Sequence, residues 1–188
     1  MCGIFFYISQ QKISITNYQA ISKEFMNMVA RGPDNSKLIR RNNYIIGFHR
    51  LAIMDISSKG DQPILGNDAE TQLTICNGEI YNHKQLASQF SIPLETGSDC
   101  EIIMKLYKKI GPVQLIKQLD GVFAYIILDD EKDLVIVGRD PFGVRSLYYG
   151  YQQDGNLCFS SELKSLHKIC EPASIQMFPP GNTLLYNT

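Results

Sequence analysis

The sequence lacks the features that would place it among membrane, secreted or nucleic-acid-binding proteins. None of its apolar runs approaches the roughly 18 residues of a membrane-spanning helix. No charged segment leads into an apolar one at the start, as it does in a secretory signal peptide. The net charge of the 188 residues is only −1, so no excess of basic charge draws the chain to nucleic acid or to an anionic membrane. We therefore expect neither nucleic acid nor membrane as a partner.

Potential metal ligands and disulfide partners are also scarce. The three histidines, His49, His83 and His167, are too scattered to form a metal-binding pair on one helix, which argues against a structural zinc site. The five cysteines include no Cys-x-x-Cys pair and leave an odd residue. This pattern favours free thiols in a reducing compartment, so we expect a cytoplasmic protein that binds no metal.

What remains is the composition of an ordinary globular protein. Hydrophobic residues make up 44% and charged residues 20% of the chain, with 14 glycines and 8 prolines. A chain of this length can bury a substantial core without disulfides. Without internal repeats or low-complexity segments, it is most simply a single domain over residues 1–188.

The most informative stretch is residues 1–5, Met-Cys-Gly-Ile-Phe. If Met1 is removed, Cys2 becomes the first residue and carries both a thiol and a free α-amine. The reference pKa of that amine, about 7.7 to 8.0, suits a general base that activates the thiol. A small residue at a disordered terminus is the alternative, but residues 4–8 are typical of a buried strand that anchors the terminus. If Met1 stays, the amine is displaced and this chemistry fails.

Hydrophobic periodicity predicts a mixture of strands and helices. Strands are expected at 4–8, 38–41, 44–49, 51–54, 72–76, 122–128, 134–137, 147–151, 157–160 and 183–186. Helices are expected to begin near Thr16 or Asn17, at Asn82 and at Ser98 or Asp99, with two shorter ones at 113–119 and 162–167. The polar segment 55–70 is long enough to be a lid.

Three polar positions have both a structural and a functional interpretation. Arg50 lies between two apolar runs, where it either snorkels to water or binds a carboxylate through its planar fork. Asn77-Gly78 is typical of a hairpin turn, yet an amide beside a glycine N–H also suits an oxyanion hole. Asp99 is either a helix cap or a carboxylate that receives a substrate ammonium. The residues alone leave these interpretations open.

Taken together, the motifs of the chain resemble the glutaminase domain of class II glutamine amidotransferases, which are N-terminal-nucleophile hydrolases. The residues that follow Arg50 and Asn77 are most similar to the glutamine-hydrolysing asparagine synthetase branch. Ala52 stands where that branch often has Ser, which should not touch the chemistry if only the backbone contributes there. The motifs are Cys2-Gly3-Ile4, Arg31-Gly32-Pro33-Asp34, His49-Arg50-Leu51, Gln62-Pro63, 77–83, Gly97-Ser98-Asp99, 119–124, 139–145, 161–164 and Pro179-Pro180-Gly181.

The resemblance implies a role in the reaction for three of these residues. Cys2 would be the nucleophile, with its own α-amine as the base. The side-chain amide of Asn77 and the backbone N–H of Gly78 would bind the oxyanion. The implied reaction is hydrolysis of L-glutamine to glutamate and ammonia through a thioester on Cys2.

The resemblance also implies how the substrate is bound. Arg50 would bind the α-carboxylate of L-glutamine, and Glu79 with Asp99 would receive its α-ammonium. Arg31 and the 139–145 loop would brace the site. The same pocket would be lined by the backbone of Leu51, Ala52, Ile53 and Met54.

The fold that the resemblance implies is an α+β, four-layer αββα sandwich of two antiparallel sheets between helical layers. No Walker A, dinucleotide or pyrophosphate-loop motif is found in the sequence, so we expect the ATP-dependent synthetase domain to be absent. The chain would then need no cofactor, with ATP and Mg²⁺ used by a synthetase domain or subunit that accepts the ammonia and makes asparagine from aspartate. A homodimer, a stand-alone amidohydrolase and a non-catalytic regulatory module of the same fold remain open.

Overall fold

The computed structural model describes residues 1–187, which form two compact units. The first unit contains Met1–Leu51 and Ser146–Pro179, and the second contains Ala52–Arg145 and residues 180–187. Each unit has one antiparallel sheet and its own helices.

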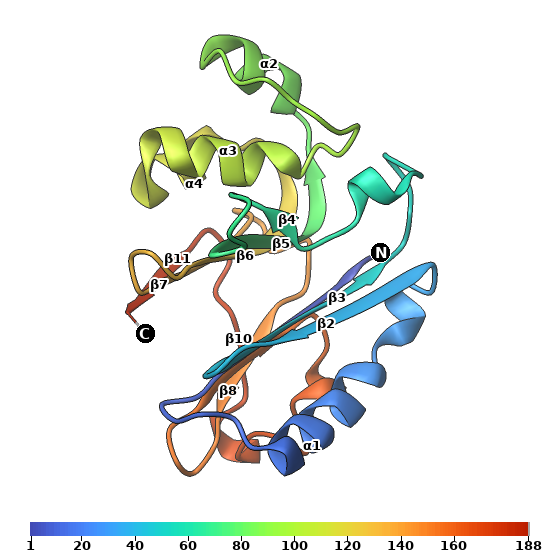
Figure 1. Ribbon diagram of the computed structural model, residues 1–188, viewed down its shortest axis with the longest axis vertical. Coiled ribbons are helices and arrows are strands. Elements are labelled where there is room, and N and C mark those ends of the chain that lie inside the picture. The colour runs from blue at the N-terminus through green and yellow to red at the C-terminus, as the bar shows by residue number, and fades with distance from the viewer. Residues whose placement is uncertain (188) are drawn as a thin grey trace. The chain divides into compact units, whose positions relative to one another are not determined.

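The first unit is built on a six-stranded sheet with the strand order β10-β8-β9-β1-β3-β2. Helix α1 lies along one face of this sheet (Figure 1). Phe5 and Tyr7 of β1 pack in one core with Ile21 and Phe25 of α1, as expected when alternate side chains of a strand face a helix. The elements are β1 (Gly3–Ile8), α1 (Ile15–Met26), β2 (Asn35–Arg40), β3 (Tyr44–Arg50), β8 (Tyr148–Tyr151), β9 (Leu157–Ser160) and β10 (Gln176–Met177), with 3₁₀ turns at Val29–Arg31, Leu163–Ser165 and Pro172–Ser174.

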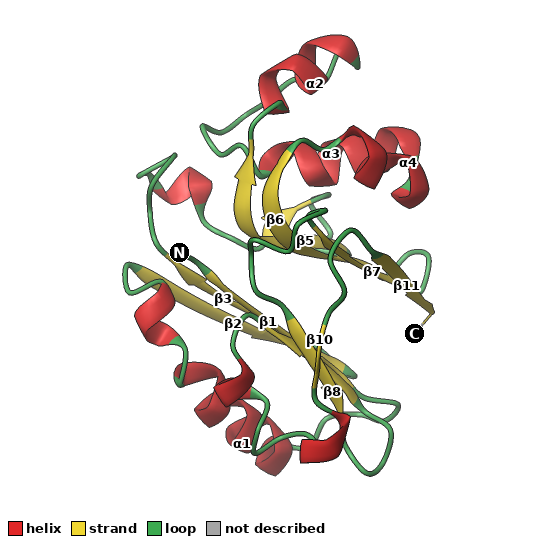
Figure 2. Cartoon of the chain, turned by 180° about the vertical axis from the view of Figure 1, so that it is seen from behind, coloured by secondary structure: helices red, strands yellow, loops and turns green. Residues whose placement is uncertain are grey.

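The second unit has a five-stranded sheet with the order β11-β7-β6-β5-β4. Helices α2, α3 and α4 lie on one side of this sheet (Figure 2). Their apolar residues share a core with Cys76 and Ile80 of β5 and with Phe123 and Tyr125 of β6. The elements are β4 (Ile64–Leu65), β5 (Gln72–Ile80), α2 (His83–Gln89), α3 (Glu101–Ile110), α4 (Pro112–Gln118), β6 (Gly121–Asp129), β7 (Leu134–Arg139) and β11 (Thr183–Asn187), with a 3₁₀ turn at Ser58–Gly60.

The largest correction to the sequence-based assignment concerns Asn77-Gly78. The structure continues β5 through both residues as far as Ile80, so the hairpin-turn interpretation is wrong. Pairing with β6 overrides the local preference for a turn, and Gly78 lies opposite Phe123. A Cβ on Gly78 would come within 2.4 Å of the Val122 carbonyl oxygen, so the glycine is required by close strand packing.

The strand expected at 51–54 is also wrong. These residues form a loop, in which Ile53 and Met54 are 63% and 55% exposed. A four-residue apolar run becomes a strand only when a neighbouring strand pairs with it, and β3 ends at Arg50.

Two helix starts differ from the sequence-based expectation. Ser14 caps α1, where its hydroxyl accepts a hydrogen bond from the Asn17 N–H at 3.1 Å. Helix α3 begins at Glu101 after Cys100. Asp99 therefore does not cap α3, and its carboxylate instead accepts a hydrogen bond from the Ile80 N–H at 2.6 Å.

Glu101 anchors the loop that leads into α3. Its carboxylate is almost fully buried and accepts hydrogen bonds from the N–H of Glu95 at 2.9 Å and of Thr96 at 2.8 Å. Lys105 lies 2.7 Å away in an ion pair. Burial alone would raise the pKa of Glu101, but the hydrogen bonds from Lys105, Thr96 and Glu95 lower it. The charged form is therefore the stabilising form.

We expect Glu101→Gln to lower the free energy of unfolding at pH 7 by about 1.5 to 3 kcal/mol, because buried hydrogen bonds to a charged group are weakened. A lowered folded-state pKa contributes stability that is present above the unfolded-state pKa and is lost as the pH falls through the folded-state value. The difference between wild type and variant should therefore shrink in urea unfolding near pH 4. Glu95→Gln is the control, because Glu95 pairs with the same Lys105 but its side chain is 77% exposed. An equal loss in both variants would contradict this account.

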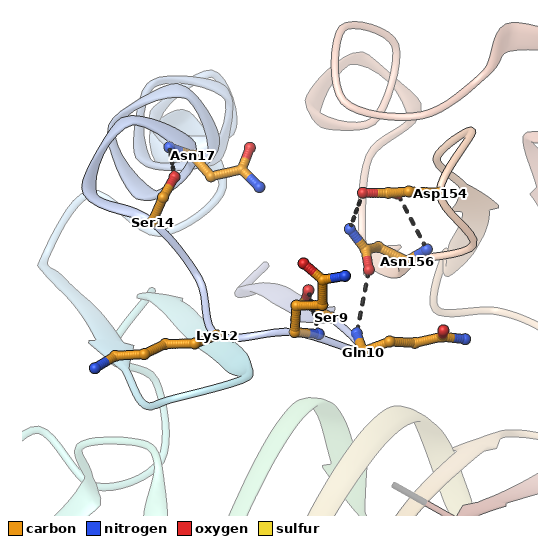
Figure 3. A pocket seen from close by; sticks show the side chains of 8 residues that line it. Ser9, Gln10, Lys12, Ser14, Asn17, Asp154 and Asn156 are labelled. Atoms are coloured by element: carbon orange, nitrogen blue, oxygen red, sulfur yellow. Dashed lines mark hydrogen bonds between the residues drawn. The ribbon is translucent and has the colours of Figure 1, made fainter.

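A polar cavity of about 370 Å³ lies in the first unit, near the end of β1 (Figure 3). Its polar groups largely bond to one another. The Asn156 amide donates to the Tyr7 hydroxyl at 2.8 Å and to Asp154 at 2.8 Å, and its oxygen accepts from the Gln10 N–H. Burial raises the pKa of Tyr7 to about 12, so the phenol stays protonated. The hydrogen bonds of this cavity therefore serve to join the turns around it.

Candidate active site

Cys2 directly precedes β1 and is held by contacts with two residues of the first unit, Leu51 and Arg31. The Leu51 N–H donates to its sulfur at 3.4 Å, and the thiol lies 3.6 Å from the Leu51 carbonyl oxygen. The Arg31 Nε donates to the Cys2 carbonyl oxygen at 2.8 Å. Cys2 is half-buried, whereas the four other cysteines are buried. Cys2 thus carries the one accessible thiol, and an N–H group is directed at its sulfur.

Arg31 links Cys2 to a second segment of the first unit. Its guanidinium forms an ion pair with Glu162 at 3.4 Å, and Glu162 also pairs with Lys164. The side chain of Arg31 is only 11% exposed. These contacts agree with the bracing role that the resemblance implied for Arg31.

Arg50 ends β3 and is buried, with 7% of its surface exposed. The interpretation as a snorkelling surface residue is therefore wrong. Its backbone is fixed by the turn at 31–34, because the Asp34 N–H donates to the Arg50 carbonyl oxygen at 3.0 Å. Gly32 packs directly on this strand, where a Cβ would come within 2.5 Å of the Arg50 backbone. The turn at 31–34, which the sequence predicted only as a loop, therefore positions the buried Arg50.

In the second unit, the orientation of Gly78 follows from the hydrogen bonds of its partner strand. In an antiparallel ladder, the backbone groups of successive residues point alternately to the two neighbouring strands. Phe123 lies opposite Gly78, but its backbone groups bond to Asp140 and not to β5. The Phe123 N–H donates to the Asp140 carboxylate at 3.2 Å, and the Phe123 carbonyl oxygen accepts from the Asp140 N–H at 2.8 Å. The N–H of Gly78 therefore points away from β6, towards the open edge of β5.

This edge of β5 is satisfied mainly by side chains. The Cys76 N–H donates to Gln62 at 2.6 Å, and the Ile80 N–H donates to Asp99 at 2.6 Å. Strand β4 pairs with β5 only at residues 73–74. The Gly78 N–H lies between these two bonded groups and outside the β5–β6 ladder, so it is oriented as a donor.

Asn77 carries a second donor next to this N–H. The residue is 1% exposed, and its amide nitrogen has no hydrogen-bond acceptor within residues 1–187. A buried unsatisfied amide costs free energy, so its presence calls for an explanation. Because strand side chains alternate, Asn77 projects from the face of the sheet opposite Cys76 and Ile80, which pack with the helices. Asn77 thus provides an amide donor that has no structural use.

Two carboxylates lie close to these donors in the second unit. Asp99 is 4% exposed, and burial raises its pKa, while the hydrogen bond from Ile80 and the proximity of His83 oppose the rise. Glu79 forms an ion pair with Arg145 at 2.9 Å and keeps 46% of its side chain exposed. A bound cation would stabilise the charged form of Asp99 and so offset the cost of its burial.

The loop at 139–145 holds Arg145 in place. The Asp140 carboxylate accepts hydrogen bonds from the N–H groups of Phe142 and Val144 at 3.0 Å and of Arg145 at 3.2 Å. Arg139 donates to the carbonyl oxygen of Arg145 at 2.7 Å. These contacts agree with the bracing role expected for this loop.

The structure therefore groups the predicted site residues within each unit. Cys2, Arg50 and Leu51 lie together in the first unit. Asn77, Gly78, Glu79 and Asp99 lie together in the second unit, which also contains the loop residues Ala52, Ile53 and Met54. The roles assigned to these residues stay predictions.

Two residues that organise the site were not identified as such from the sequence. Gln62 and Asp140 act through backbone groups that are distant in the chain, and no local pattern reveals such contacts. The signal that was available is their presence in the Gln62-Pro63 and 139–145 motifs of the resemblance. In the described part of the chain, no group of three or more His, Cys, Asp or Glu residues is arranged to hold a metal ion. Nor does any helix of residues 1–187 combine the length and apolar character needed to cross a bilayer.

Comparison with solved structures identifies the fold. The glutamine phosphoribosylpyrophosphate amidotransferase of Bacillus subtilis, complexed with ADP and GMP, matches 99% of this chain and 47% of that chain, with a TM-score of 0.81 and 20% identity. The match to a glutamine aminotransferase class-II domain protein of Silicibacter pomeroyi covers 98% of this chain and 93% of that chain, with a TM-score of 0.55 and 14% identity. The expected α+β fold class, with two antiparallel sheets and helices, is therefore confirmed.

Sequence comparison identifies the family. A family model described as a glutamine amidotransferase domain matches residues 1–178. The chain is 38% identical over 183 residues to the glutamine-hydrolyzing asparagine synthetase of Triphysaria versicolor, which covers 97% of this chain and 30% of that protein. It is 40% identical over 156 residues to the glutamine-hydrolyzing asparagine synthetase B of Escherichia coli K12, and this match covers 82% of this chain and 27% of that protein. The chain belongs to the class II glutamine amidotransferase domain family and spans less than a third of the length of these relatives.

Proposed function

We propose that this chain hydrolyses L-glutamine to glutamate and ammonia, with Cys2 as the nucleophile, and that it supplies the ammonia to asparagine synthesis. The observation that supports this most strongly is the buried Asn77 amide nitrogen, which has no acceptor within residues 1–187 and lies beside the Gly78 N–H that points away from β6. Two neighbouring N–H donors of this kind, an unbonded side-chain amide and a backbone N–H that points away from β6, are what an oxyanion hole requires.

The proposed reaction begins once Met1 has been removed. Met1 is 55% exposed, which leaves it accessible to removal. The α-amine of Cys2 then takes the thiol proton, and the thiolate attacks the carboxamide carbon of glutamine. The resulting oxyanion is bound by Asn77 and Gly78. As it collapses, the C–N bond breaks and the amine returns its proton to the departing ammonia, which leaves a γ-glutamyl thioester.

Water then hydrolyses the thioester. The same amine acts as the base that takes a proton from water, and a second oxyanion forms at the same carbon. When the C–S bond breaks, the thiol is restored and glutamate is released. The reaction has no redox step and no group transfer to a cofactor, so we propose that the chain needs none and that ATP and Mg²⁺ belong to the synthetase part.

Recognition of glutamine as an amino acid requires both a cation and an anion. We propose that Arg50 binds the α-carboxylate, because its buried guanidinium can form two parallel hydrogen bonds with it. Asp99 and Glu79 would bind the α-ammonium, and the backbone at 51–54 would line the pocket.

The partner that accepts ammonia is proposed from the relatives. The two proteins compared above are named as glutamine-hydrolyzing asparagine synthetases, and this chain covers only 30% and 27% of their length. We propose a synthetase domain or subunit that uses the ammonia to form asparagine from aspartate. A homodimer and a cytoplasmic location stay predictions.

The test of this function is a substrate panel with the purified chain. We expect glutamate and ammonia to be released in equal amounts from L-glutamine. Release should be much slower from D-glutamine and from glutaramide, because glutaramide lacks the α-carboxylate and the α-ammonium. Equal turnover of glutaramide and L-glutamine would contradict amino-acid recognition. Absence of release from a sample whose intact mass shows that Met1 has been removed, with the synthetase partner added, would contradict the proposed activity.

We expect Arg50→Lys to weaken glutamine binding more than it slows turnover. Lysine keeps the charge but cannot form two parallel hydrogen bonds with a carboxylate. KM should rise roughly 10-fold or more, with a smaller change in kcat, because the contact is made equally in the ground and transition states. Steady-state kinetics measure this split. Arg40→Lys, on β2, is the control and should leave both constants unchanged, whereas a fall in kcat at constant KM for Arg50→Lys would contradict the assignment.

A further inference from the structure

The side chain of a buried glutamine in the second unit forms the two backbone hydrogen bonds that a neighbouring strand would otherwise form with β5. Gln62 is 6% exposed, and its side-chain oxygen accepts from the Cys76 N–H at 2.6 Å while its amide donates to the Cys76 carbonyl oxygen at 3.1 Å. Strand β4 pairs Ile64 with Thr74, and continuing this register would place Gln62 opposite Cys76. Pro63 has no N–H and cannot extend the ladder, so the Gln62 side chain provides both bonds.

The two hydrogen bonds of Gln62 hold Cys76, the residue that directly precedes the proposed oxyanion donors Asn77 and Gly78 in β5. The Asn77 amide nitrogen has no acceptor within residues 1–187, so no hydrogen bond from this nitrogen aims the side chain. Its direction, like that of the Gly78 N–H, depends on where the backbone of β5 lies.

We propose that Gln62 is a positioning residue for the oxyanion hole, which it fixes by holding both backbone groups of Cys76. This inference rests on the proposed function, because it assumes that Asn77 and Gly78 bind an oxyanion. The two side-chain hydrogen bonds of Gln62 go to the backbone of Cys76, and we assign it no contact with the substrate. Its effect is on the alignment of the donors, and misplacement of a reacting group by about 1 Å can lower a rate by as much as 10²-fold.

The test compares two buried glutamines of the same unit. Gln62→Met keeps the side-chain volume but removes both hydrogen bonds. The matched control is Gln72→Met, because Gln72 is 5% exposed, lies on β5 and donates to Asp129 at 3.3 Å, five residues away from Asn77. Both variants should unfold at lower urea concentration. Only Gln62→Met should lower kcat for glutamate release, by roughly 10-fold to 100-fold with KM within about 2-fold.

A second variant, Gln62→Glu, gives a pH dependence of kcat that a purely structural role of Gln62 would not produce. In Gln62→Glu, the protonated carboxyl can accept from the Cys76 N–H and donate to the Cys76 carbonyl oxygen, whereas the ionised form can only accept. Burial raises the pKa of such a carboxyl. The ratio of the kcat of Gln62→Glu to that of wild type should therefore rise as the pH is lowered.

Amide hydrogen exchange separates this inference from the proposed function. Exchange of the Asn77 N–H should be faster in Gln62→Met and unchanged in Gln72→Met. If wild type with Met1 removed and the synthetase partner added releases no glutamate but this difference is seen, Gln62 still fixes the backbone of β5 and it is the proposed function that fails. Wild-type kcat in Gln62→Met, or an equal loss of kcat in Gln72→Met, would overturn the inference.

Discussion

Replacing Cys2 with alanine should reduce glutamate release from L-glutamine by roughly 10⁴-fold or more, the scale seen when a catalytic nucleophile is removed. The thiol is the only group in the proposed site that can form the thioester. KM loses its meaning when turnover vanishes, so binding should be measured directly by calorimetry. We expect glutamine to bind the variant with little change, because its charged groups are bound by other residues.

The control for this result is a second cysteine in the same unit. Cys170 is 5% exposed and belongs to the apolar core with Phe5 and Tyr7, so Cys170→Ala should lower stability but keep kcat. In wild type, iodoacetamide should modify the half-buried Cys2 first, and intact mass should show one addition that coincides with loss of activity. Activity retained in Cys2→Ala would contradict the mechanism.

Replacing Asn77 with alanine should lower kcat by roughly 10²-fold to 10³-fold, the effect of losing one oxyanion donor. KM should change much less, because the oxyanion exists only in the transition state and the intermediates. Asn77→Asp should be at least as slow, since a carboxylate offers no donor and repels the developing charge. Steady-state kinetics of the three proteins provide the measurement.

Asn82→Ala is a suitable comparison for Asn77→Ala. Asn82 belongs to the same unit and uses its side chain structurally, donating to the Gln118 carbonyl oxygen at 2.8 Å and accepting from the Asp120 N–H at 3.0 Å. We expect Asn82→Ala to lose stability and keep kcat. We expect Asn77→Ala to lose kcat with a smaller loss of stability, because its amide nitrogen forms no bond that would be broken. An effect of Asn77→Ala on KM alone would contradict the oxyanion assignment.

Much of the fold could be predicted from the sequence because its elements have strong local signals. The buried strand after Cys2, the hairpin around residues 42–43 and the apolar run at 122–128 follow from periodicity, and each was confirmed by β1, by β2 with β3, and by β6. The family was also predictable, because its motifs lie in a fixed order along the chain and the comparisons confirm it.

The sequence by itself determined which residues are candidates for the chemistry, since residue type and motif order suffice for that. Only the tertiary structure decided how they are held. In the structure, Asn77-Gly78 is part of β5 and not a turn. The Asp99 carboxylate accepts a hydrogen bond from the Ile80 N–H and does not cap a helix. The tertiary structure also brought Gln62 to Cys76. The physical reason is that strand pairing and buried hydrogen bonds join residues far apart in the chain, and these contacts outweigh the local preferences that a sequence displays.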